Sequence, residues 1–182
     1  MRKASVVFVL TLLCSYLAIA TQKAPKSQDQ DNDENERIAS LVITDVIGKA
    51  QFEEGQRFFQ PDSTMHFGDQ DLSLRDAIEE AQSWRRLAPD FEIRVVCIES
   101  RGELVRIRWK AKGTNTGTGE GILVPTGKHI RTHGTSEFRF ANGRIAESWL
   151  SWNEAAVLRQ LLGGDADDKD DKDDPKPRGC KM

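Results

Sequence analysis

The most regular alternation of hydrophobic and polar residues lies on either side of Asn142-Gly143. A period of two predicts β-strands, and Asn-Gly tolerates the positive φ angles that a two-residue hairpin turn requires. We therefore expect two long strands joined at this turn, in the centre of a sheet because both faces carry large apolar side chains. In the second strand, the expected faces are Ile145, Glu147, Trp149, Ser151 and Asn153 on one side, and Ala146, Ser148, Leu150 and Trp152 on the other.

Helical periodicity dominates the region before the strands. Apolar residues spaced three and four positions apart predict a first helix from about residue 36, with Ile38, Leu41, Val42, Val46 and Ile47 on its buried side. A second helix should begin after Ser73, whose side chain can cap it, and end before Pro89. A short amphipathic helix follows residue 153.

Two further strands are predicted between the second helix and the hairpin, at 91–99 and after Gly102. In the latter, apolar residues alternate with basic ones, as in a half-buried antiparallel strand; the apolar residues are Val105, Ile107, Trp109 and Ala111. Helices followed by antiparallel strands give an α+β fold, with the helices packed on one face of a curved sheet. A bent sheet of this kind leaves an apolar pocket at its mouth.

The first 20 residues have the layout of a signal peptide. Arg2 and Lys3 precede an apolar run, and Ala18-Ile19-Ala20 places small residues where a signal peptidase reads them. The alternative is a membrane anchor, but the run is at the short limit for a span of ~20 residues. We expect cleavage after Ala20, a secreted or periplasmic protein, and no stable membrane anchor afterwards.

The composition of the two ends of the chain predicts the bounds of the folded domain. Residues 21–35 have few apolar side chains and are expected to form a disordered linker, and 164–182 a disordered acidic tail, so that the folded domain is 36–163. The net charge is −3 with no basic run, which argues against nucleic acid as a partner.

Cys97 and Cys180 would survive cleavage of the signal peptide. We expect both to be thiols rather than partners in a disulfide, although export would permit a disulfide.

Several motifs resemble the SnoaL-like polyketide cyclase family: Gly113-Thr-Asn-Thr-Gly117, Pro125-Thr-Gly-Lys128, Phe138-Arg-Phe140, the segment 142–149, and Leu158-Arg-Gln-Leu161. The resemblance covers roughly 36–162 and implies the nuclear transport factor 2-like cone that ketosteroid isomerase shares. It also implies acid/base carbon chemistry without a cofactor, such as an aldol-type ring closure, with a carboxylate at the pocket end of the last strand.

This chain departs from the family pattern at two positions. Asn153 replaces the last aspartate of Glu-His-Trp-Asp-x-x-Asp, and Asn115 replaces the histidine of Gly-Thr-His-x-Gly. An amide cannot take up a proton at neutral pH. We therefore expect Asn115, Trp149 and Asn153 to bind a ligand rather than to act as acids or bases.

The remaining acid/base candidates are Glu147 and His66. Each has a plainer alternative: Glu147 could pair with Arg139 or Arg144 across the strands, and His66 could be a partly buried histidine with a structural hydrogen bond. His129 and His133 lie four residues apart on a strand, about 13 Å, which is too far for one metal ion. We expect neither a metal site nor a cofactor.

Two functions remain open from the sequence. The first is an exported domain that binds a small organic molecule and is either a cyclase- or isomerase-like enzyme or a degenerate one. The second is a non-catalytic interaction domain that uses its open sheet face. In both cases we expect a homodimer.

Overall fold

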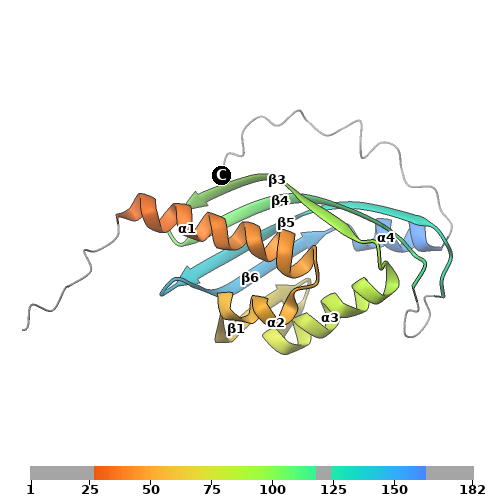
Figure 1. Cartoon of the computed structure of the whole chain (residues 1–182), viewed down its shortest axis with the longest axis horizontal. Helices are drawn as coiled ribbons and strands as arrows, with labels where there is room; N and C mark the ends of the chain where they lie inside the picture. The colour runs from red at the N-terminus through yellow and green to blue at the C-terminus, as the bar shows by residue number, and fades with distance from the viewer. Residues whose placement is uncertain (1–26, 118–123, 163–182) are drawn as a thin grey trace, which may run out of the picture.

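The computed structural model describes residues 27–117 and 124–162, which form helices packed on a curved, six-stranded, mostly antiparallel sheet (Figure 1). The strand order is β2-β1-β6-β5-β4-β3. The elements are α1 (Gln28–Leu41), η1 (Val42–Ile47), α2 (Phe52–Gly55), η2 (Gln56–Phe58), β1 (Phe59–Phe67), β2 (Gln70–Ser73), α3 (Leu74–Leu87), β3 (Glu92–Arg101), β4 (Leu104–Thr114), β5 (His129–Ala141), β6 (Arg144–Trp152) and α4 (Glu154–Leu161). The predicted α+β class is confirmed.

The central hairpin is β5-turn-β6, as the sequence predicts. Asn142 and Gly143 have φ angles of 53° and 73°, the left-handed values that the tight turn requires. β5 and β6 occupy the two middle positions of the sheet. The pairing of β6 with β1 is parallel, however, and not antiparallel as expected. Sequence alternation cannot distinguish the two, because the side-chain period is two in both.

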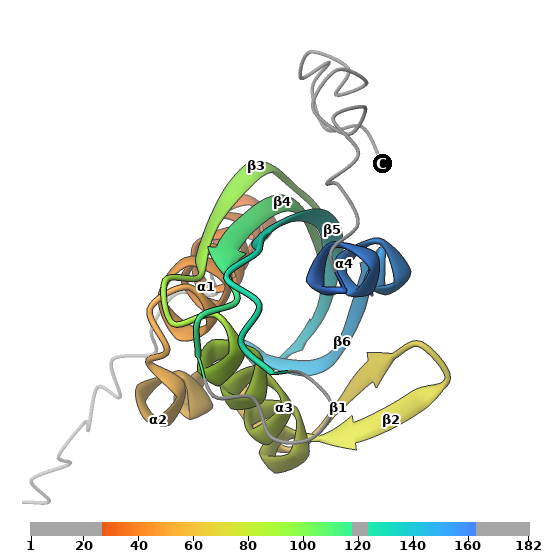
Figure 2. The same cartoon turned by 90° about the vertical axis from the view of Figure 1, so that its right-hand side faces the viewer.

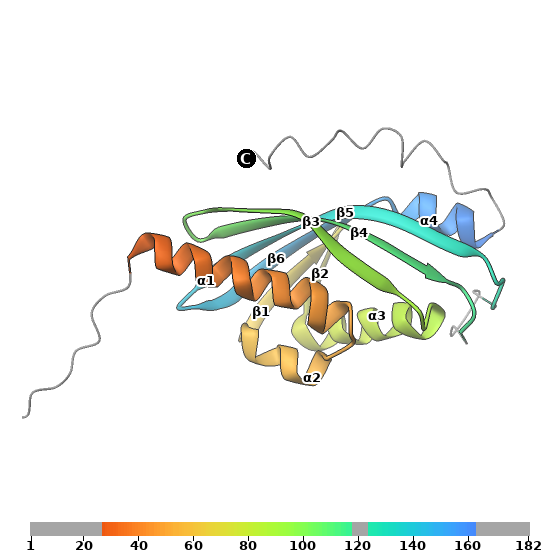
Figure 3. The ribbon, with the colours of Figure 1, turned by 45° about the horizontal axis from the view of Figure 1, so that its top comes forward.

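The sheet arches around helices α1 and α3, which lie along its open, concave side (Figure 2). Apolar side chains of α1 and η1 meet those of β4, β5 and β6 in one core. The four apolar residues predicted to face inward on β4 are all buried: Val105, Ile107, Trp109 and Ala111. A second cluster joins the end of α3 to α4 through Leu87, Val157 and Leu161. α4 lies at the opposite end of the sheet from the start of α1 (Figure 3).

The first helix begins earlier than the sequence suggested. Ser27 caps α1 by accepting a hydrogen bond from the Gln30 backbone N–H, while the Gln30 side chain accepts one from the Ser27 N–H. Asn35 is already buried against the domain. Residues 28–35, expected to belong to a disordered linker, are therefore helical. The capping box stabilises the start of this helix, although residues 28–35 have few apolar side chains.

The predicted cap of the second helix is present. Ser73 accepts a hydrogen bond from the Asp76 backbone N–H at 3.3 Å, and α3 runs to Leu87 as expected. The short strand β2 was not predicted. It pairs with β1 after a turn at Gly68, whose φ angle is 57°. This hairpin forms one edge of the sheet.

Three other expectations concern the cysteines and the ends of the chain. Cys97 is disulfide-bonded, so its interpretation as a thiol is wrong. The predicted signal peptide and acidic tail lie outside the described residues. None of the helices in the described part of the chain is long and apolar enough to span a membrane.

Candidate functional site

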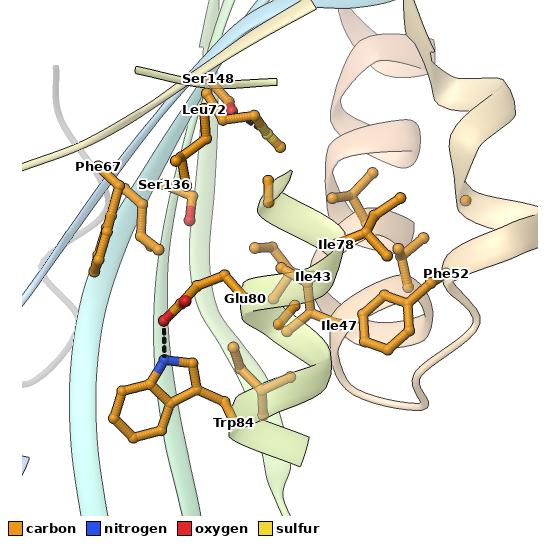
Figure 4. Close-up of a pocket in the computed structure, with 18 of the residues that line it drawn as sticks. Ile43, Ile47, Phe52, Phe67, Leu72, Ile78, Glu80, Trp84, Ser136 and Ser148 are labelled. Atoms are coloured by element: carbon orange, nitrogen blue, oxygen red, sulfur yellow. Dashed lines mark hydrogen bonds between the residues drawn. The ribbon is translucent and has the colours of Figure 1, made fainter. Parts of the chain in front are cut away.

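A cavity of about 210 Å³ lies between the concave face of the sheet and helices η1 and α3. We call it the inner cavity. Figure 4 shows side chains from the helices on one side of it and from the strands on the other. Its wall is mainly apolar and includes Ile43, Val46, Ile47, Phe52, Phe59, Met65, Phe67, Leu72, Ile78, Trp84, Trp109, Phe138 and Trp152.

Most polar side chains in this wall are already hydrogen-bonded. Trp109 donates its indole N–H to the Ser136 hydroxyl at 3.0 Å, and this pair is buried. On α3, Trp84 donates its indole N–H to a Glu80 carboxylate oxygen at 3.0 Å, one helical turn away (Figure 4). The Ser148 hydroxyl lies 3.1 Å from the Met65 sulfur. These bonds leave few polar groups in the wall for a ligand.

Trp152 differs from these hydrogen-bonded side chains of the cavity wall. Its indole nitrogen is buried and has no hydrogen-bond partner among the described residues. The ring is held on two sides, stacked on Phe67 at 6.4 Å and edge-on to Trp84 at 5.0 Å between ring centroids. A buried donor without a partner is unfavourable, typically by about 1–3 kcal/mol. An acceptor atom on a bound molecule would relieve this.

Arg85 fixes the helical side of the inner cavity. Its guanidinium donates hydrogen bonds to the backbone carbonyls of Ile47 at 3.0 Å and Phe91 at 2.9 Å, and also to that of Gly48. Removal from water lowers the pKa of Arg85 from its usual value. This one side chain therefore ties the end of the π-helix η1 to the start of β3.

The two faces of β6 differ from the prediction because the strand contains a β-bulge at Ala146. On β5, Arg139 pairs with Glu147 and the next residue, Phe140, pairs with Ile145, which leaves Ala146 without a partner. Ile145 therefore shares the inner face with Ser148 and not with Glu147. The sequence pattern assumed a strict period of two, which a bulge shifts by one residue.

Glu147 consequently lies on the outer, convex face of the sheet. Its carboxylate is 2.8 Å from the Arg139 guanidinium, the ion pair that was the alternative interpretation of this residue. The hydrogen bond from Arg139 lowers the pKa of Glu147 from its usual value. Glu147 is not among the residues that line the inner cavity. A carboxylate whose pKa is lowered is also a weaker base than one whose pKa is raised by burial.

His66 and Trp149 also meet on the outer face. The His66 Nδ1 atom lies 2.7 Å from an Asp71 carboxylate oxygen on β2, and the imidazole stacks on the Trp149 indole at 5.0 Å between centroids. Trp149 is itself among the residues that line the inner cavity, although the register pairs it with Glu137 on the outer face and its indole stacks there on His66. Its ring is thus partnered outside the inner cavity.

The two asparagines have structural partners. Asn153 is exposed and caps α4, accepting a hydrogen bond from the Ala156 N–H at 3.0 Å, so it does not point into the inner cavity as expected. Asn115 is fully buried and donates to the Val124 carbonyl and the Thr126 hydroxyl, both at 3.1 Å. Its side chain holds residues 124–126 against the end of β4.

The polar residues that do reach the inner cavity were missed in the sequence. They include Glu80, Ser136, Ser148 and Trp152. The spacing of Glu80 and Trp84, four residues apart on one helix face, is a signal that could have been used. Within 27–117 and 124–162, no group of three or more His, Cys, Asp or Glu side chains is arranged to hold a metal ion.

Comparison with known proteins places this geometry in a family. The family model of the SnoaL-like polyketide cyclases matches residues 37–161. The chain belongs to the SnoaL-like polyketide cyclase family. A comparison with curated proteins found no match.

Solved structures show the same fold at low identity. A proposed SnoaL-like polyketide cyclase from Jannaschia sp. CCS1 is 17% identical with a TM-score of 0.68, over 78% of this chain and 100% of that one. AclR, a proposed hydroxylase from Streptomyces galilaeus, is 22% identical with a TM-score of 0.65, over 71% and 82%. IdmH, a proposed polyketide cyclase from Streptomyces antibioticus, is 23% identical with a TM-score of 0.59, over 75% and 99%.

Proposed function

We propose that this SnoaL-like domain binds a small, mainly apolar organic molecule in the inner cavity, and that the molecule accepts a hydrogen bond from Trp152. The observation that carries the proposal is the buried indole N–H of Trp152, which has no partner in the described part of the chain. The apolar wall supplies the driving force by removing ligand surface from water. The rings of Phe67 and Trp84 hold Trp152 in place, which limits the entropy lost on binding.

A matched pair of probes tests this arrangement. 2-Acetylnaphthalene carries a carbonyl acceptor, and 2-ethylnaphthalene has a similar shape without one. We expect Trp152→Phe to weaken binding of the ketone about 5- to 10-fold, since a net hydrogen bond is worth roughly 1–1.5 kcal/mol, and to leave the hydrocarbon's affinity nearly unchanged. The control is His66→Phe, which changes an aromatic ring on the outer face that does not line the inner cavity. Equal losses for both probes would contradict the role of the N–H, and no binding of either would contradict the function.

A second candidate function is acid/base catalysis of the cyclase or isomerase type. The observation that favours it is Glu80, whose carboxylate lines the inner cavity beside Trp84. We propose Glu80, rather than Glu147, as the base, because a base must lie within hydrogen-bond reach of its substrate. Glu80→Gln keeps an acceptor for Trp84 and should abolish turnover of an enolisable ketone while preserving its binding. Glu147→Gln should retain the turnover; the reverse result would restore the sequence prediction.

We also propose export, on the strength of the basic residues and apolar run at the N-terminus. Intact-mass measurement of the secreted protein should give Thr21 as the first residue. Retention of Met1 with tight membrane association would contradict it.

The alternative to a binding cavity is an interaction domain that dimerises through the outer face. The stacked rings of His66 and Trp149 on that face support it. We propose that Trp149→Asp converts a homodimer to a monomer, to be measured by light scattering after gel filtration. A monomeric wild-type protein would contradict this.

A further inference from the structure

A second, larger hollow adjoins the inner cavity. This groove has a volume of about 960 Å³ and lies between the β1-β2 hairpin, α3 and the start of α4. Five residues line both hollows: Phe67, Leu72, Glu80, Leu150 and Trp152. Trp152, with its unpartnered N–H, thus stands at the junction between them.

The groove differs sharply in charge from the inner cavity. Its wall contains one cationic side chain, Arg86, and five carboxylates, which belong to Asp69, Asp76, Glu79, Glu80 and Glu154. Arg86 is turned to the Ser83 hydroxyl at 2.8 Å and bonds to none of these carboxylates. Carboxylates that crowd a concave surface produce a negative potential, which the low-dielectric walls concentrate.

Only two of these carboxylates are committed to other groups. Asp76 accepts hydrogen bonds from Ser73 and Arg75, and Glu80 accepts one from Trp84. The side chains of Asp69, Glu79 and Glu154 have no ion pair among the residues that the structure describes. Three carboxylates without counter-charges are therefore available to a cation in the groove.

We infer that the natural ligand is a cationic amphiphile, with an apolar ring system in the inner cavity and an ammonium group in the groove. The inference rests on the proposed function and specifies its substrate class. An organic cation suits the groove better than a bare metal ion, because the carboxylates come from three separate elements and no described cluster of them is arranged to hold a metal. An ammonium ion can bind one or two of them and keep part of its hydration.

Three naphthalene probes of similar shape separate charge from apolar binding: 2-naphthylmethylamine as the cation, 2-naphthylmethanol as the neutral analogue and 2-naphthoate as the anion. Titration calorimetry with the full mature protein at low salt should give the order amine, alcohol, acid. We expect the amine to bind about tenfold more tightly than the alcohol, and this preference to shrink at high salt because exposed charges are screened.

Paired variants locate the source of the preference. Glu79→Gln combined with Glu154→Gln removes two unpaired carboxylates from exposed positions. This double variant should lower the amine's affinity at least threefold and leave the alcohol's affinity unchanged. The control, Glu103→Gln, changes an exposed carboxylate in the turn between β3 and β4, away from the groove, and should alter neither.

The outcomes test the cationic ligand separately from the binding of an apolar molecule in the inner cavity. If the alcohol binds and the amine binds no better, the cationic ligand is wrong and the inner cavity still binds an apolar molecule. If the preference survives in the double variant, the groove is not its source and the inference is again wrong. If the alcohol does not bind at all, the proposed function itself fails.

Discussion

Gly134, in the middle of β5, is a position at which a very small substitution should have a large effect. It lies opposite Trp109 on β4 and Trp152 on β6, with its open side toward the inner face. A Cβ atom added there would lie 2.6 Å from the backbone carbonyl oxygen of Ser151 and 2.7 Å from Cη2 of Trp109. Gly134→Ala therefore forces a buried indole and a strand backbone apart.

The size of the effect follows from these distances. Ordinary carbon contacts begin at 3.4 Å, and Cζ2 of Trp109 lies closer to the added atom than Cη2 does, so the neighbours must move by about 0.7–1.0 Å. Overpacking of a core typically costs 1–3 kcal/mol, and displacement of the Trp109 ring also weakens its hydrogen bond to Ser136, worth about 1 kcal/mol. Reduced entropy of the unfolded chain offsets at most about 1 kcal/mol. We expect the free energy of unfolding to fall by about 2–3 kcal/mol, and Tm by roughly 10 °C.

Urea denaturation followed by far-UV circular dichroism measures this loss. Thr135→Ala, at the neighbouring position on the outer face, is the control and should change stability by less than about 1 kcal/mol. The test of cause is the same glycine substitution in a Trp109→Leu background, where part of the clash is absent. The cost should shrink there. A cost that is equal in both backgrounds, or below about 0.5 kcal/mol in the wild type, would refute the reasoning.

Three further predictions concern single side chains. Arg85→Met should lower the free energy of unfolding by about 2–3 kcal/mol in urea titrations, since it leaves backbone carbonyls without a charged donor; a loss under 1 kcal/mol would contradict this. Asn153→Ala should destabilise the protein by about 1 kcal/mol and Asn153→Asp should not, because aspartate caps a helix equally well; a large loss with aspartate would mean that the side chain is buried in solution. Hydrogen bonds from Thr114 hold the pKa of Asp90 below its usual value, so the stability that Asp90 contributes is full above its unfolded pKa and is lost as pH falls through the folded one. Asp90→Asn should therefore flatten the fall in Tm between about pH 5 and pH 2, and an unchanged slope would contradict the assignment.

The parts of the fold that the sequence predicted correctly depend on local rules. Asn142-Gly143 requires left-handed backbone angles, Ser73 caps a helix, and the residues of β4 alternate strictly because one face is buried. The parts that it missed depend on the partner of each segment. The parallel pairing of β1 with β6 joins residues about 80 positions apart, and the π-helical turn of η1 forms where α1 meets the sheet. No local pattern specifies either feature.

The bulge in β6 accounts for one part of the misplaced candidate site. A strict period of two puts Glu147 on the same face of the strand as the buried Ile145. The bulge at Ala146 puts the two side chains on opposite faces. Residues beyond the bulge keep their parity with one another, so the error moved Glu147 and Trp149 together, whereas Asn153 lies beyond β6 and caps α4. A one-residue insertion reverses the faces of everything that follows it.

The same bulge explains why the inner cavity has the polar groups that it does. By reversing the faces, it turns Ser148 and Trp152 inward, toward Met65 and Phe67, and turns the charged Glu147 outward to Arg139. With the original register, a carboxylate would face the apolar wall and have to be desolvated, while an indole would be exposed. The bulge therefore keeps the charge of Glu147 out of the cavity. A wall of that kind is suited to holding an acceptor atom of a ligand, and it leaves the acidic residues at the groove as the charges that an incoming molecule meets.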